Sequence, residues 1–223
     1  MKSRLLKAAG VIGALTLLSR ILGMIRDILS AKGFGTTWQW DAFIYAFMLP
    51  NFMRRLVGEG ALTSAFIPVY TEVLEKEGEE RARRLANVIF TLLFWGLIGF
   101  LLLAQGCLFL LRGTTAPPAF HLTVKLLQVL FPYLFFIALS ALATGILNAH
   151  HHFFSPALNP VILDLVWIAG VLWVGSLTGV EAEEKIFFLS IFILASGVIQ
   201  LGVQWPSLLR LGFSPRFIFD FSH

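Results

Sequence analysis

The hydrophobic residues of this chain are gathered into continuous runs, each long enough to cross a lipid bilayer. Only helices satisfy every backbone polar group of such a run within hydrocarbon, since the runs are not the alternating segments of a membrane barrel. The sequence therefore predicts an all-α polytopic membrane bundle of about six spans, each near the ~20 residues that a membrane helix requires. The expected spans are 8–31, 39–57, 86–111, 122–148, 159–178 and 186–208.

The composition excludes several classes of protein. Only 13% of the residues are charged, against about 25% in soluble domains. The net charge of +4 does not indicate a nucleic-acid partner, because the basic residues flank or interrupt apolar runs and form no soluble basic face. The sequence has no phosphate-binding loop, nucleophile elbow or zinc-protease motif. The tract His150–His152 has no accompanying cysteines or carboxylates, so we interpret it as an interface anchor and expect neither an enzyme nor a metal site.

Arginines interrupt the first two apolar runs. Arg20 and Arg26 lie within the first, and Arg54 and Arg55 follow the stretch AFIYAFMLPNFM of the second. Placing one arginine at the centre of a bilayer costs roughly 2.5–3.5 kcal/mol on insertion scales. Several arginines are tolerated where they face a wet cavity lined by protein, so the sequence predicts a cationic chamber for an anion.

The polar residues of the first run share one helical face, and Arg20 and Asp27 widen this stripe. Arginine stays charged and grips phosphate with two parallel hydrogen bonds, so a diphosphate suits the stripe better than a carboxylate does. The alternative is a buried ion-pair network, for example Arg20 with Asp27 or Asp41. The residues that form the stripe are Thr16, Ser19, Gly23, Arg26 and Ser30.

The second run contains a proline and an ion pair that affect its arginines. Pro50 removes a backbone donor, and the side chain of Asn51 can satisfy a freed group. Arg55 and Glu59 are four residues apart and partly neutralise each other, which favours Arg54 as the anion ligand. We interpret the glycines that flank Glu59 as a hinge.

The distribution of lysine and arginine predicts the orientation. The N-terminal tail, the 75–85 loop and the C-terminal tail hold about nine basic residues, and the opposite loops hold about four. The rule that cytoplasmic loops are the more basic ones therefore places both termini in the cytoplasm.

Several strings resemble the MurJ/MviN lipid II flippases, which belong to the multidrug/oligosaccharidyl-lipid/polysaccharide exporter superfamily. The most specific are SRILGMIRD (19–27), DAF (41–43), LPNFMRRLVGEGA (49–61) and AFIPVY (65–70). FPYLFF (131–136) and GILNAHHHFFSPALNPVILD (145–164) are similar too, so the resemblance extends over the whole chain.

The resemblance implies a flippase of the bacterial inner membrane that moves the undecaprenyl-diphosphate-linked peptidoglycan precursor by alternating access. It implies no cofactor, with the membrane potential or a monovalent cation as candidate energy sources. The implied partners are the lipid-linked precursor, membrane lipids and other cell-wall synthesis proteins. Family members have about fourteen helices in two lobes, so we expect residues 1–213 to be the N-terminal lobe and 214–223 to begin a connection to a second lobe.

The family's cavity arginines match Arg20, Arg26 and Arg54 here, whereas Asp164 stands where asparagine is expected and receives no role. The expected substrate-binding residues are Ser19, Arg20, Arg26, Asn51, Arg54 and Arg55. The expected structural or gating residues are Gly23, Asp27, Asp41, Pro50, Glu59 and Gly60.

Three other functions stay open. Another exporter of the superfamily would carry polyprenyl-glycans or drugs, although cationic drugs favour acids and aromatics over clustered arginines. A non-transporting half-protein would bind lipid without cycling. An intramembrane enzyme would need a base or paired carboxylates beside the arginines, and none occurs at suitable spacing.

Overall fold

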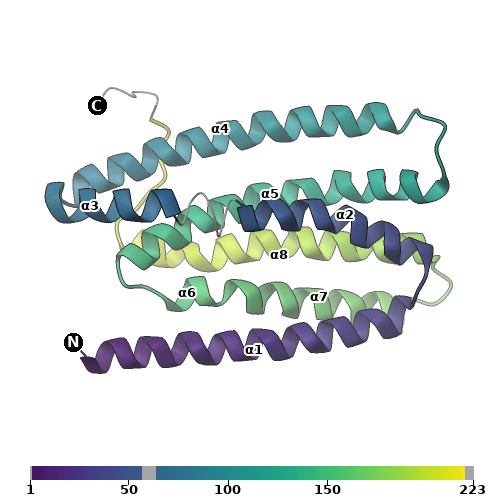
Figure 1. Ribbon diagram of the computed structural model, residues 1–223, viewed down its shortest axis with the longest axis horizontal. Coiled ribbons are helices and arrows are strands. Elements are labelled where there is room, and N and C mark those ends of the chain that lie inside the picture. Colours follow the sequence, from purple (N-terminus) through teal and green to yellow (C-terminus); the bar gives the residue numbers. More distant parts are fainter. Residues whose placement is uncertain (1, 57–63, 219–223) are drawn as a thin grey trace.

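Long helices lie side by side along a common axis in the computed structural model, which describes residues 2–56 and 64–218 and their side chains from residue 10 onward (Figure 1). The all-α prediction is confirmed. The helices are α1 Lys2–Phe34, α2 Trp38–Arg54, α3 Ile67–Glu77, α4 Glu79–Leu111, α5 Pro118–Ala149, α6 Phe154–Ala157, α7 Asn159–Ser176 and α8 Ala182–Arg210.

Within the described residues, four helices are long and apolar enough to cross a membrane on length and composition alone. These are α4, α5, α8 and the segment Phe154–Ser176, and they correspond to the last four expected spans. Over their described residues, the first two expected spans are not among these four helices. α2 has 17 residues, and the described part of α1 carries Arg20, Arg26 and Asp27, whose charges lower its hydropathy.

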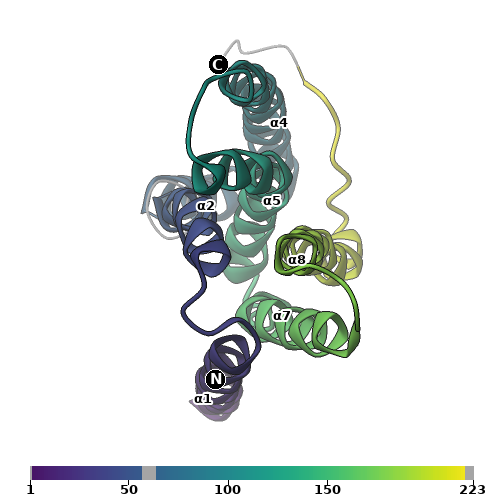
Figure 2. The ribbon, with the colours of Figure 1, turned by 90° about the vertical axis from the view of Figure 1, so that its right-hand side faces the viewer.

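α5 is the central helix of the bundle. It packs against α8, α2 and α4, and Figure 2 shows it between these neighbours. About 61% of its apolar span is buried, against 22% for α4. α1 lies at one side of the bundle, where it packs on α7 and α6.

A cluster of aromatic rings joins α2 to α7 near the turn that follows α1. Trp167 of α7 packs edge-on against Phe43 and Phe47 of α2, with ring centroids 5.6 and 5.1 Å apart. Trp40 stacks between Phe34 and Phe43. These rings fill one end of the space between α1, α2 and α7.

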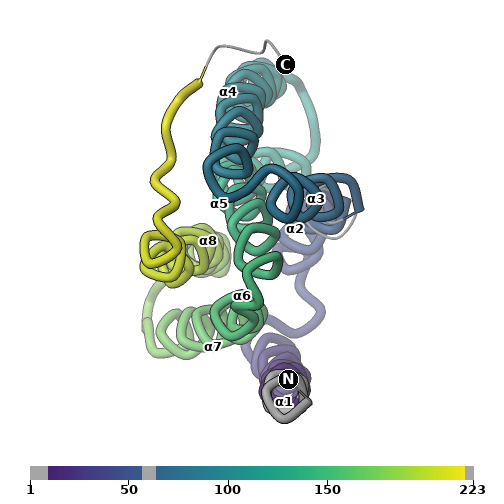
Figure 3. Tube along the Cα trace, turned by 90° about the vertical axis from the view of Figure 1, so that its left-hand side faces the viewer, coloured from purple at the N-terminus to yellow at the C-terminus, as the bar shows by residue number. Residues whose placement is uncertain are grey.

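The segment after α8 returns to α4, as Figure 3 shows. The backbone N–H of Arg216 donates to Asn87 Oδ1 at 2.8 Å, and that of Ile218 donates to Thr91 Oγ1 at 2.9 Å. The ring of Phe217 packs among aromatic side chains of α4. The expected division of the chain after residue 213 stays a prediction.

The histidine tract ends α5 and shows no metal-ligand geometry. The N–H of His152 donates to Leu147 O at 2.8 Å, and that of His151 donates to Asn148 O at 3.0 Å. His151 has a positive φ of 59°. No cluster of three or more potential metal ligands exists in the part of the chain that the structure describes.

Candidate functional site

A cavity of about 460 Å³ opens between α1, α2, α5, α7 and α8. It exists because α1 packs on α7 while α2 packs on α5, so the two arginine-bearing helices lie on different walls. The volume lies within the range of about 300–1,000 Å³ typical of ligand pockets. Its polar lining consists of Ser19, Arg26, Arg54, Tyr133, Ser140, Thr144, Asn159, Asp164 and Gln200.

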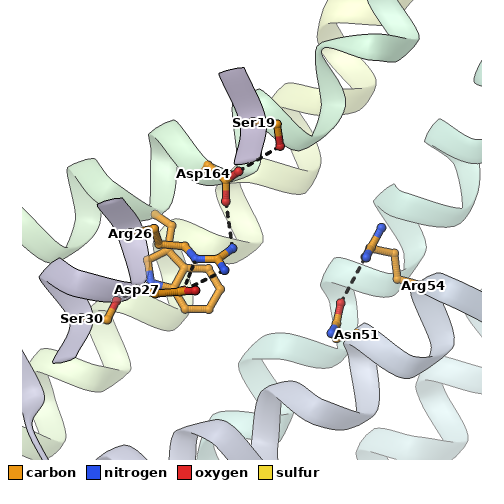
Figure 4. A network of polar contacts seen from close by, with 8 residues as sticks. Ser19, Arg26, Asp27, Ser30, Asn51, Arg54 and Asp164 are labelled. Atoms are coloured by element: carbon orange, nitrogen blue, oxygen red, sulfur yellow. Dashed lines mark hydrogen bonds and ion pairs between the residues drawn. The ribbon is translucent and has the colours of Figure 1, made fainter. Parts of the chain in front are cut away.

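Arg26 lies between two carboxylates, as Figure 4 shows. Its Nε and Nη2 donate to Asp27 Oδ1 at 2.9 and 2.8 Å, and its Nη1 donates to Asp164 Oδ1 at 2.8 Å. Its guanidinium carbon also lies 4.8 Å from the centre of the Trp167 ring, a favourable cation–π distance. Arg26 is therefore fixed from three sides at the edge of the cavity.

The predicted stripe on the first helix is one face, and four of its members meet α7. Ser19 Oγ donates to Asp164 Oδ2 at 3.2 Å, and a Cβ on Gly23 would lie 3.7 Å from the same oxygen. Trp167 Nε1 donates to Ser30 Oγ at 3.2 Å. Much of the stripe thus packs on a neighbouring helix, and Ser19 and Arg26 also reach the cavity.

The structure contains an ion-pair network on α1, but with other residues than expected. The sequence suggested Arg20 with Asp27 or Asp41, whereas the structure pairs Arg26 with Asp27 and Asp164. Asp164, which received no role, supplies the buried carboxylate. The pair of Arg26 and Asp164 was not predicted, because the two residues are 138 positions apart in the sequence. An acid within an apolar run is nevertheless itself a signal of function.

The other predicted ligands divide between the cavity and the exposed surface. Arg54 lines the cavity from α2, where its Nε donates to Asn51 Oδ1 at 3.2 Å. Arg20 and Arg55 are exposed and lie outside the cavity lining. Their roles as ligands stay predictions.

The predicted structural residues are also dispersed. Pro50 is buried inside α2, and Asp41 is exposed in the first turn of that helix. Asp27 is exposed and paired with Arg26. Glu59 and Gly60 lie outside the described residues.

The wall opposite Arg26 carries polar groups that the sequence argument did not single out. Tyr133 and Gln200 are buried there, and their side chains interact with each other. Behind them, Gln204 Nε2 donates to Ser140 Oγ at 2.6 Å and to Asn159 Oδ1 at 3.0 Å. Amides within apolar runs were the available signal, since a polar group in hydrocarbon requires a partner.

Comparisons with known proteins identify the family of this chain. The sequence model of the family described as lipid II flippase MurJ matches residues 30–223. A probable lipid II flippase MurJ from Rhizobium tropici is 36% identical over 225 residues, which cover 96% of this chain and 42% of the relative. The lipid II flippase MurJ of Burkholderia cenocepacia is 33% identical over 217 residues, which cover 95% of this chain and 41% of the relative.

A solved structure is similar as well. A lipid II flippase MurJ in an inward closed conformation matches this fold with a TM-score of 0.75 and 28% sequence identity. The match covers 94% of this chain and 43% of the solved one. The chain therefore spans less than half the length of the relatives it matches.

Proposed function

This chain belongs to the MurJ lipid II flippase family, and on that premise we propose that its cavity holds the diphosphate of a polyprenyl-linked peptidoglycan precursor. The precursor's head group crosses the bacterial inner membrane in this cavity while the polyprenyl tail stays in lipid. Flippases are transporters, so no residue here is assigned a catalytic role.

The observation that carries the proposal is that Arg26 and Arg54 reach one cavity from two helices on different walls. A diphosphate presents several oxygens, and two guanidinium groups on opposite sides match it better than a single cationic group. The cavity supplies the polar contacts that hydrocarbon lacks, and hence lowers the barrier to crossing.

Arg20 fits the proposal as a ligand in another stage of the cycle. It is exposed in this conformation, and alternating access moves one lobe of such a transporter against the other around the site. The same movement exposes the head group on the opposite side. Membrane potential biases the return of a net-positive empty cavity, since each charge moved is worth about 2.3 kcal/mol per 100 mV.

The charge distribution supports an N-terminus in the cytoplasm. The start of α1, the α3–α4 turn and the end of α8 lie at the same end of the bundle in Figure 1. In the described part of the chain, this end carries Lys76, Arg81, Arg83, Arg84 and Arg210, whereas the other end carries Lys32, Arg112, Lys125 and Lys185.

A drug exporter is the weaker alternative because its substrates are cationic. Two arginines and one carboxylate line the described cavity, so it does not favour a cation. A half-protein that binds lipid without transporting it is the second candidate, because a cavity that holds the head group accounts for binding and not by itself for transport.

A transport assay tests the proposal and this second candidate together. Vesicles containing the chain and a fluorescent polyprenyl-diphosphate-glycan lipid are treated with a membrane-impermeant quencher. Transport predicts loss of the inner-leaflet fluorescence, which Arg26→Ala and Arg54→Ala slow at least about tenfold. A rate equal to that of protein-free vesicles, despite lipid binding by the chain, supports the half-protein instead.

A further inference from the structure

Asp164 is a buried acid that faces an arginine of the proposed site. The residue is 5% exposed, and its two oxygens accept hydrogen bonds from Arg26 Nη1 and Ser19 Oγ at 2.8 and 3.2 Å. The carboxylate lies against α1 at Gly23, where a Cβ would be in ordinary van der Waals contact with it at 3.7 Å. Asp164 therefore occupies the position beside Arg26 that an anionic ligand would take.

The two carboxylates on Arg26 are not equivalent. The side chain of Asp27 is 70% exposed, whereas that of Asp164 is 7% exposed. Asp164 lines the cavity, and Asp27 is not among its lining residues. An anion that enters the cavity therefore meets Asp164, rather than Asp27, as its competitor for Arg26.

We propose that Asp164 is a specificity-determining residue, an internal monoanion that a ligand must displace from Arg26. This inference rests on the proposed function. It assigns the cavity to lipids with a diphosphate head group and against lipids with a single phosphodiester, such as phosphatidylglycerol.

Charge explains the discrimination. A phosphodiester carries one negative charge, so exchanging it for the Asp164 carboxylate at Arg26 replaces one monoanion by another and gives no net attraction. A diphosphate carries more than one charge and reaches Arg26 and Arg54 together, so it gains a contact that the carboxylate does not make. Both ligands meet the same cost of displacing Asp164, and only the diphosphate has a second contact that exceeds it, so a phosphodiester is kept out at concentrations at which a diphosphate binds.

Discrimination against phosphodiester lipids matters in a membrane. Phospholipid head groups surround the protein at concentrations far above that of any transport intermediate. A cavity of unopposed arginines would bind them by charge alone. The displaced Asp164 keeps the Ser19 hydroxyl as a donor, which lowers the cost of the exchange.

A competition assay tests the inference. The purified chain in neutral detergent is saturated with radiolabelled undecaprenyl diphosphate, and phosphatidylglycerol is added as competitor. For the wild-type chain we expect the half-displacing concentration of phosphatidylglycerol to exceed that of unlabelled undecaprenyl diphosphate by at least about tenfold. Equal concentrations overturn the inference without any variant.

The variants isolate the carboxylate. Asp164→Asn keeps the shape and removes the charge, and we expect labelled phosphatidylglycerol to bind this variant about tenfold more tightly than it binds the wild-type chain. Asp164→Glu keeps the charge and should keep the wild-type affinity. Glu72→Gln is the matched control, because it neutralises an exposed acid that pairs with Lys76 far from the cavity.

Each result supports or overturns one claim. An unchanged affinity of Asp164→Asn for phosphatidylglycerol overturns the role of Asp164, while the proposed function stands if Arg26→Ala still weakens diphosphate binding. No diphosphate binding by a folded wild-type chain overturns both. If Asp164→Asn lowers the unfolding midpoint too far for the assay, Asp164→Ser removes the same charge with a smaller side chain and gives the same readout.

Discussion

His150 gives the fold a dependence on pH. Burial, more than the neighbouring Arg83, lowers the pKa of His150 from its ordinary value of 6.5. Its Nε2 is 3.1 Å from the hydroxyl of Tyr70, whose pKa burial raises to about 12. The Tyr70 hydroxyl therefore stays protonated at physiological pH.

The sign follows from proton counts. Below about pH 6.5 the unfolded chain binds a proton at His150 that the folded chain resists, so stability present above that pH is lost as pH falls. We expect the unfolding midpoint to drop between about pH 7 and about pH 5. His150→Gln should reduce this drop in the unfolding midpoint. His152→Gln, at an exposed position, should reduce it less. Equal pH profiles for the two variants exclude His150 as the cause.

Helix periodicity predicted which side chains of α1 share a face, but it did not predict which residues of other helices they contact. The spacing of Ser19, Gly23, Arg26 and Ser30 follows from helix geometry alone, and the structure confirms that they lie together. Their partner Asp164 is distant in sequence, and no local periodicity encodes which helix packs against which. The exclusion of Arg20 from the cavity lining likewise depends on where α7 lies.

At the scale of elements, α5 and α8 end in the same hydrogen-bonded turn with different residues at its key position. After α8, the N–H of Phe213 donates to Leu208 O and Gly212 adopts a φ of 70°. After α5, His151 takes the equivalent place with a φ of 59°. A residue with a Cβ is strained in this left-handed conformation by roughly 1–2 kcal/mol.

We therefore expect His151→Gly to raise the free energy of unfolding by up to about 1 kcal/mol, measured by thermal unfolding. His152→Gly is the control, because a glycine there gains flexibility without relieving strain and should not stabilise. A loss of stability in His151→Gly indicates that the imidazole makes contacts worth more than the strain.

Close packing of α8 against α5 depends on one glycine. A Cβ on Gly197 would lie 2.9 Å from the Tyr133 ring, whereas a Cβ on Gly202 of the same helix meets nothing within 4 Å. We expect Gly197→Ala to destabilise by about 1–3 kcal/mol through overpacking and Gly202→Ala to stabilise by about 0.5–1 kcal/mol through helix propensity. Thermal unfolding of the two variants checks the pair, and equal shifts contradict the packing.

The existence of the helices was predictable, because hydropathy and length largely determine a membrane helix. The ends of the helices were less predictable. The last four expected spans fall within α4, α5, α7 and α8 to within a few residues, except where the polar 79–85 segment continues α4 beyond the apolar run. α3, from Ile67 to Glu77, is a helix that none of the expected spans includes. Residues 214–218 were expected to begin a connection to a second lobe, and the contacts of this segment with Asn87 and Thr91 had no local signal.

At the scale of the whole molecule, α1 packs on the bundle mainly through α7. Much of the remaining surface of α1 is apolar. Val11, Leu17, Leu18, Ile21, Met24, Ile25 and Ile28 are exposed on α1. Lipid or protein covers such a surface in a membrane. The wall of the cavity that carries Arg26 is formed by this helix, which packs on α7 and α6.

The central claim is that Arg26 and Arg54 bind a diphosphate head group, and equilibrium binding tests it most directly. The folded chain is titrated with a polyprenyl-diphosphate glycan lipid beside Arg20→Ala, Arg26→Ala and Arg54→Ala. Arg112→Ala, at the exposed end of α4, is the matched control. We predict salt-sensitive binding that Arg26→Ala and Arg54→Ala each weaken at least about tenfold and that Arg112→Ala leaves unchanged. Equal affinity in all these folded variants would contradict the claim and reduce the cavity arginines to structural ion pairs.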